Sequence, residues 1–172
     1  MSDGGVIVAD SGPIIHLSRV GLLDVLPALY GTIVVPSAVF REVVHDGAGQ
    51  AGSAELAGAK WAEIVDHDDQ DPLFLGFLRI LQIGESAAIS IAYARRAQLV
   101  LVDDNHARMS AKSLGLAVKG TLGLLVLAKQ RGHIATVLPK IRELRSQHVW
   151  ISAEVVRRAL REAGEDESDV GG

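Results

Sequence analysis

The sequence predicts an α/β fold in which a parallel sheet is covered by helices on both faces. Three runs carry this prediction: VIVAD at residues 6–10, TIVVP at 32–36 and LVLV at 99–102. Each run is short and apolar without alternation, the pattern of a strand buried on both faces. Helical spacing separates the runs, and strands that alternate with helices form parallel sheets. Aromatic residues make up only 4% of the chain, so we expect a core of Ala, Val, Leu and Ile.

The other predicted elements follow along the chain without an internal repeat or a dividing linker. They are two short helices within 14–26, a helix over 37–44, a loop or weak helix over 45–59, a possible strand at 61–65, helices over 72–81, 84–97 and 104–114, a minimal strand at 117–118, and helices over 121–132, 134–147 and 152–163. We expect one domain over residues 1–164. The polar tail at 165–172 is too poor in apolar residues to be ordered.

Composition excludes several classes of protein. The 172 residues suit one domain, and the absence of cysteine excludes disulfide scaffolds, thiolate metal sites and cysteine nucleophiles. The opening MSDGG lacks the basic region of a signal peptide, and no apolar run approaches the roughly 18 residues that span a bilayer. We therefore expect a cytoplasmic protein without a membrane partner. The net charge of −4 indicates that any nucleic acid would be bound by local contacts only.

Acidic residues fall at the ends of two predicted strands. Asp10 ends the first strand, and Asp103 with Asp104 ends the strand at 99–102. Sites in open parallel sheets lie outside the carboxyl ends of the strands, so these acids are expected at one edge. Carboxylates brought together repel unless a cation lies between them, and Mg²⁺ or Mn²⁺ suits ligands that are all oxygen. The pattern predicts a divalent metal site.

A structural interpretation competes with the metal site. Asp is a good helix N-cap and suits the positive end of the helix dipole, which accounts for any one of these acids alone. Glu85, in the first helical turn of GESAAIS, and Glu42, beside an apolar stripe, also have ordinary structural explanations. The occurrence of acids after two buried strands of one sheet favours a site.

Three segments resemble a PIN-domain protein, in the branch known as a PIN-like domain of unknown function and related to bacterial and archaeal toxin nucleases. They are VIVADSGPIIHLSRVGLLDVLPALYGTIVVPSAVFREV, IGESAAISIAYARRAQLVLVDDNHARMSAKSLGLAVKGTLGLLVLAKQRGHI and VWISAEVVRRALREAGE. The resemblance covers roughly residues 6–164. It implies a three-layer α/β/α sandwich around a mainly parallel sheet of four to five strands.

The resemblance also implies a set of site residues. The four catalytic acids, which would hold the metal, are Asp10, Glu42, Glu85 and Asp104. Asp103 is an additional acid, as a ligand or a support, and Ser11 and Thr121 are supporting residues, with Ser11 able to orient Asp10. Because side chains alternate along a strand, we expect Asp103 to point away from the side that Asp104 occupies, unless the helix has already begun.

The implied activity is that of a Mg²⁺- or Mn²⁺-dependent endoribonuclease, in which the metal activates a water that attacks an RNA phosphodiester. Candidate phosphate contacts are Arg108, Lys112 and Lys119, although a solvated helix face explains the first two equally well. The resemblance further implies the toxin of a type II toxin–antitoxin pair, a small antitoxin partner and a homodimer.

Two other functions remain open. A catalytically weak or inactive binding subunit with the same fold is supported by the acidic net charge and by Ser11-Gly12, where relatives commonly carry Thr then Ser. A phosphatase or receiver domain ranks third, because the first strand lacks a second acid after Asp10. His16 and His106 lie near the acids and could touch a substrate, although ordinary surface or edge positions explain them better.

Overall fold

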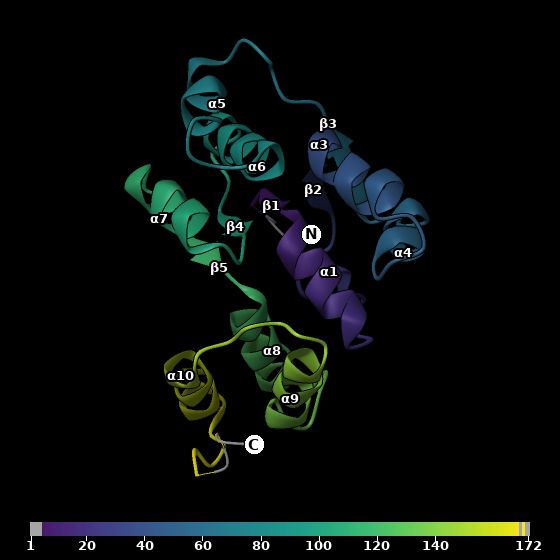
Figure 1. The fold of residues 1–172 in the computed structure, drawn as a ribbon, viewed down its shortest axis with the longest axis vertical. Helices are drawn as coiled ribbons and strands as arrows, with labels where there is room; N and C mark the ends of the chain where they lie inside the picture. Colours follow the sequence, from purple (N-terminus) through teal and green to yellow (C-terminus); the bar gives the residue numbers. More distant parts are fainter. Residues whose placement is uncertain (1–4, 169, 171–172) are drawn as a thin grey trace. The chain divides into compact units, whose positions relative to one another are not determined.

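The computed structural model describes residues 5–168 and residue 170. The chain divides into two compact units, Met1–Gly120 and Thr121–Gly172 (Figure 1). The single domain expected over residues 1–164 remains a prediction. Among the described residues, no helix is long and apolar enough to cross a membrane.

The first unit is built on a five-stranded sheet in the order β3-β2-β1-β4-β5, and every pair of neighbouring strands is parallel. The strands are β1 (Ile7–Ala9), β2 (Ile33–Pro36), β3 (Ala62–Val65), β4 (Leu99–Leu101) and β5 (Val118–Lys119). This confirms the predicted parallel sheet. The minimal strand expected at 117–118 lies one residue later.

The helices of the first unit follow the predicted order. They are α1 (Ser11–Arg19), α2 (Val25–Tyr30), α3 (Ser37–Phe40), the π-helix η1 (Arg41–Asp46), α4 (Ser53–Ala57), α5 (Pro72–Phe77), α6 (Ile83–Ala94) and α7 (Asn105–Ser113). The segment 37–44 was expected to form one helix, but α3 ends at Phe40 and continues as the π-helix η1 from Arg41. The N–H of Gly47 donates to the carbonyl of Glu42 at 2.9 Å, five residues back, which is the bond of a π-helix.

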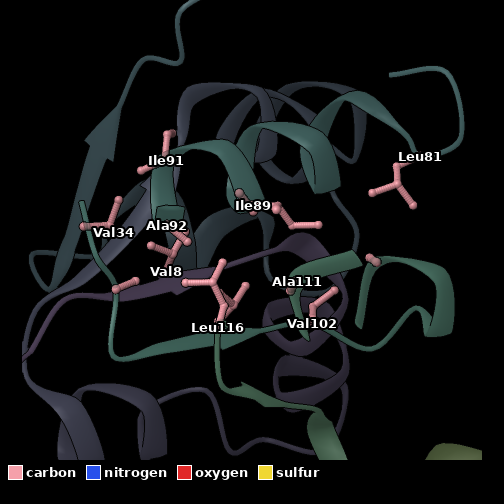
Figure 2. Close-up of a cluster of buried hydrophobic side chains, with 13 residues drawn as sticks. Val8, Val34, Leu81, Ile89, Ile91, Ala92, Val102, Ala111 and Leu116 are labelled. Carbon is pink, nitrogen blue, oxygen red and sulfur yellow. The ribbon is translucent and has the colours of Figure 1, made fainter. Parts of the chain in front are cut away.

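Apolar side chains cover both faces of the sheet, because successive residues of a strand point to opposite sides. On one face, Val8 and Val34 belong to a buried cluster with Ile89 of α6, Ala111 of α7 and Leu116 (Figure 2). The alternate strand residues are buried as well: Ile7, Ala9, Ile33, Val35 and Leu101. This confirms the three-layer α/β/α sandwich and explains why the strand sequences are apolar without alternation.

The second unit consists of α8 (Thr121–Gln130), α9 (Leu138–Ser146) and α10 (Ala153–Ala163), with α10 packed on α8. Glu165 follows the last helix. Its Oε1 accepts hydrogen bonds from Lys129 Nζ at 2.9 Å and Val137 N at 2.6 Å, and its Oε2 accepts one from Leu138 N at 3.0 Å. The tail expected to be disordered begins at this residue, and its positions 169, 171 and 172 lie outside the described residues.

Candidate active site

The carboxyl ends of β1 and β4 lie side by side at the centre of the sheet, where Ala9 is opposite Leu101. The chain runs from β1 to its neighbour β2 and later returns to β4 on the other side of β1, so the strand order reverses at this point. Binding sites of open parallel sheets form at such reversals. The N–H of Asp10 donates to the carbonyl of Leu101 at 2.9 Å, and Asp103 follows β4 after one intervening residue.

Asp10 is buried, with 4% of its surface exposed. Its Oδ1 atom has no hydrogen-bond partner among the described residues. Burial is the largest cause of the rise in the pKa of Asp10 to about 7; the backbone N–H of Ser11 opposes this rise, and the charges of Glu85, Glu42 and Asp103 contribute to it. In the described structure the Asp10 side chain makes no capping hydrogen bond to α1, so helix capping does not explain this acid.

Glu42 lies beside Asp10 and projects from the π-helix η1. The Ser11 hydroxyl donates to Glu42 Oε1 at 3.0 Å. Ser11 was expected to orient Asp10, but its hydroxyl orients Glu42. A methyl group added at Gly84 would lie 3.0 Å from Glu42 Oε2 and 3.4 Å from Asp10 Oδ1. Both carboxylates therefore approach the same glycine, which leaves them room because it has no side chain.

Glu85, the residue after that glycine, lies in the first turn of α6. Its Oε2 atom accepts a hydrogen bond from the N–H of Gln82 at 3.0 Å, which confirms part of the structural interpretation. Partial burial raises the pKa of Glu85 above its usual range; the bond from Gln82 opposes this rise, and the charges of Asp104 and Glu42 add to it. Glu85 thus serves the helix end and also shares the electrostatic field of the acids.

Asp103 is bordered by Gly12 in the first turn of α1, by Gly120 after β5 and by His16. Its Oδ2 atom lies 2.7 Å from His16 Nδ1. A methyl group at Gly12 would lie 3.2 Å from Oδ2, and one at Gly120 would lie 2.9 Å from Oδ1. The charge of Asp103 contributes to the raised pKa of Asp10, so this carboxylate belongs to the same group of acids.

Asp104 has a different role in the described geometry. It is exposed, and its Oδ1 atom caps α7 by accepting a hydrogen bond from the N–H of Ala107 at 2.9 Å. The expectation that Asp103 and Asp104 point to opposite sides remains a prediction, but the charge of Asp103 acts on Asp10, so Asp103 lies near the site. Strand alternation does not apply there, because β4 ends at Leu101, before both acids.

The three candidate phosphate contacts differ in their exposure to solvent. Arg108 is half-buried, and its Nη1 atom donates to the carbonyl of Val102 at 3.1 Å, which ties it to the end of β4. Lys112 is exposed on α7, and Lys119 is half-buried on β5. Thr121 is a buried residue that begins α8 in the second unit.

The acids fit a divalent cation by donor chemistry. Their carboxylate oxygens are the ligands that Mg²⁺ and Mn²⁺ prefer, and the unpartnered Oδ1 of buried Asp10 is an acceptor with nothing described to satisfy it. Within residues 5–168 and 170, no three His, Asp or Glu side chains are close enough to form a complete ligand group. The argument for a divalent cation therefore depends on the carboxylate oxygens and on the unpartnered Oδ1 of Asp10. It does not depend on a preformed coordination shell.

Sequence reasoning gave no role to Gly12 and Gly84, which border the acids, and interpreted His16 as an ordinary surface residue. Gly12 and Gly84 lie in the first turns of α1 and α6, where a residue with a side chain would be the more usual helix former. A glycine at such a place indicates a close approach by another group. His16 lies on α1 and carries no signal in its own sequence neighbourhood, because its partner Asp103 is remote in the chain.

A five-stranded parallel sheet with the buried Asp10 and further acids at its central reversal defines an α/β protein with a nuclease-type fold. The chain belongs to the PIN-domain family, whose model matches residues 6–165. The match spans the sheet, every helix of the first unit, and the three helices of the second. A search of curated proteins finds no match to the chain.

Proposed function

We propose that this protein is a divalent-metal-dependent endoribonuclease. The observation that carries the proposal is the buried Asp10, whose Oδ1 atom has no described partner and whose pKa is raised by burial and by three neighbouring acids. A carboxylate kept from water in this way needs a compensating cation or a proton. Membership of the PIN family supports the nuclease class.

The residues have distinct parts in this proposal. Asp10, Glu42, Glu85 and Asp103 would hold the cation, with Asp104 contributing at the rim beside Glu85. Ser11 orients Glu42 through the hydrogen bond to Oε1. A bound Mg²⁺ or Mn²⁺ would lower the pKa of a water molecule and stabilise negative charge on the phosphate.

The RNA would be held beside these acids by positive side chains. Arg108, Lys112 and Lys119 are the proposed phosphate contacts. The half-buried Arg108 is held at the end of β4 by its bond to Val102, so it would offer a fixed positive charge near the acids. Lys112 is exposed and would adapt to the substrate.

The biological setting we propose is a type II toxin–antitoxin pair, with the protein as a homodimeric toxin and a small antitoxin as partner. The resemblance to toxin nucleases supports this setting. The neighbouring reading frame tests it: a short gene encoding a small protein of the DNA-binding type is expected directly upstream. Light scattering at tens of micromolar protein tests the dimer, which a monomer at that concentration would contradict.

The activity is tested with purified protein and single-stranded RNA. We expect cleavage with Mn²⁺ or Mg²⁺, none in EDTA, and none from Asp10→Asn. The variant replaces a buried charge by an amide, so its melting temperature in EDTA at pH 8 should be no lower than that of the unsubstituted chain. Cleavage in EDTA, or by Asp10→Asn, would overturn the proposal. Mn²⁺ binding without cleavage under any metal would favour the inactive binding subunit.

A further inference from the structure

We propose that His16 is a positioning residue, which fixes the Asp103 carboxylate in the orientation needed to bind the cation. The inference rests on the proposed function, because it assigns Asp103 to the ion. His16 is not one of the residues proposed to bind the cation.

The first support is the contact between His16 and Asp103. The Nδ1 atom of His16 lies 2.7 Å from Asp103 Oδ2, and the two side chains are only 23% and 26% exposed. A carboxylate only accepts hydrogen bonds, so Nδ1 is the donor. The bond joins α1, which follows β1, to the segment between β4 and α7. It therefore connects the chain just after one of the two adjacent strands to the chain just after the other.

The second support is the space around the carboxylate. Gly12 faces Oδ2 and Gly120 faces Oδ1, each so closely that a methyl group there would lie 3.2 Å or 2.9 Å from the oxygen. The carboxylate therefore occupies a slot between the first turn of α1 and the segment that follows β5. A side chain bounded on two sides and held by a hydrogen bond has few rotamers, which lowers the entropy lost when an ion binds.

The third support is the place of Asp103 among the acids. Its charge contributes to the electrostatics of Asp10, while the neighbouring Asp104 caps α7. Carboxylates that bind metals are themselves commonly held by hydrogen bonds, and loss of such a partner weakens metal affinity by about 10- to 100-fold. A contact with a merely structural role would affect folding and leave ion affinity unchanged.

The test compares Mn²⁺ affinity by calorimetry with the melting temperature in EDTA, using the full chain. We expect His16→Leu to weaken Mn²⁺ binding by about tenfold or more. His16→Asn, whose amide nitrogen reaches about the place of Nδ1, should recover most of the affinity. His16→Gln places its amide farther out and should not. If the Leu variant proves unstable, the difference in Mn²⁺ affinity between His16→Asn and His16→Gln still tests whether His16 positions Asp103.

A double-mutant cycle tests whether His16 acts through Asp103. Asp103→Asn should weaken Mn²⁺ binding, and adding His16→Leu to it should cause no further loss. Unchanged Mn²⁺ affinity in His16→Leu, or an equal loss with and without Asp103, would overturn the inference and leave the proposed function standing. If the unsubstituted chain binds no Mn²⁺, the proposed function fails and the inference fails with it.

Discussion

Asp103 and Asp104 are neighbours in the chain, but their side chains have different surroundings. Asp103 lies in a slot beside His16 and contributes to the charge at Asp10. Asp104 is exposed and accepts the capping hydrogen bond of α7. The resemblance alone favours Asp104 as the ligand, whereas the geometry gives Asp103 the closer relation to the buried acid.

We predict that Asp103→Asn weakens Mn²⁺ binding and RNA cleavage at least tenfold more than Asp104→Asn, a difference of about 1.4 kcal/mol or more. Asn caps helices as well as Asp does, so Asp104→Asn should also keep its melting temperature in EDTA. Calorimetry and a cleavage assay on both variants check the order. The reverse order would return the ligand role to Asp104, as the sequence indicates.

At the scale of elements, the first turn of α6 begins the helix and also borders the carboxylates of the candidate site. Gly84 precedes Glu85 there, and it is the point that Glu42 and Asp10 both approach. A glycine within a helix normally lowers stability relative to alanine by about 0.5–1 kcal/mol. This glycine is explained by the space that it leaves for the two carboxylates.

We predict that Gly84→Ala weakens Mn²⁺ affinity without lowering the melting temperature in EDTA by more than a few degrees, because the methyl group would displace the end of the Glu42 side chain. Gly76→Ala in α5 is the matched control, since a methyl group there meets nothing within 4 Å. It should raise stability slightly and leave Mn²⁺ affinity unchanged. Equal affinities for Gly84→Ala and the unsubstituted chain would show that Gly84 has no part in the site.

Elements that depend on local sequence were predictable, and those that depend on remote neighbours were not. The runs at β1, β2 and β4 are apolar without alternation, which indicates burial on both faces wherever the strands end up. The π-helix η1 and the pairing of His16 with Asp103 have no such local signature. The place of Asp10 directly after β1 was predictable, whereas its lack of a capping bond was not.

At the scale of the molecule, the second unit has an ionic contact of its own. Glu165 is 12% exposed in its side chain and accepts bonds from Lys129, Val137 and Leu138. Burial acts to raise the pKa of Glu165, but the bonds from these three residues outweigh it, and the pKa lies below the usual range. The folded protein therefore favours the ionised form of this side chain.

We predict that this contact stabilises the protein above about pH 4.5, the ordinary Glu value, and that its contribution is lost as the pH falls through the lower pKa of the folded state. Glu165→Gln should lower the free energy of unfolding near pH 7, and the difference from the unsubstituted chain should shrink toward acid pH. Urea unfolding in EDTA at several pH values measures it. A difference that is the same at all pH values would mean that ionisation of Glu165 is not involved.

The order of the strands has a consequence for the newly made chain. Asp10 leaves the ribosome early, but its neighbour strand β4 starts only at Leu99, after β2 and β3 have been made. The group of acids therefore forms only when a contact between remote parts of the chain has closed, and such contacts form slowly. A partly synthesised chain that stops before β4 lacks Asp103 and has an incomplete centre. Under the proposed function, the chain would thus gain activity during synthesis only when most of the first unit is present.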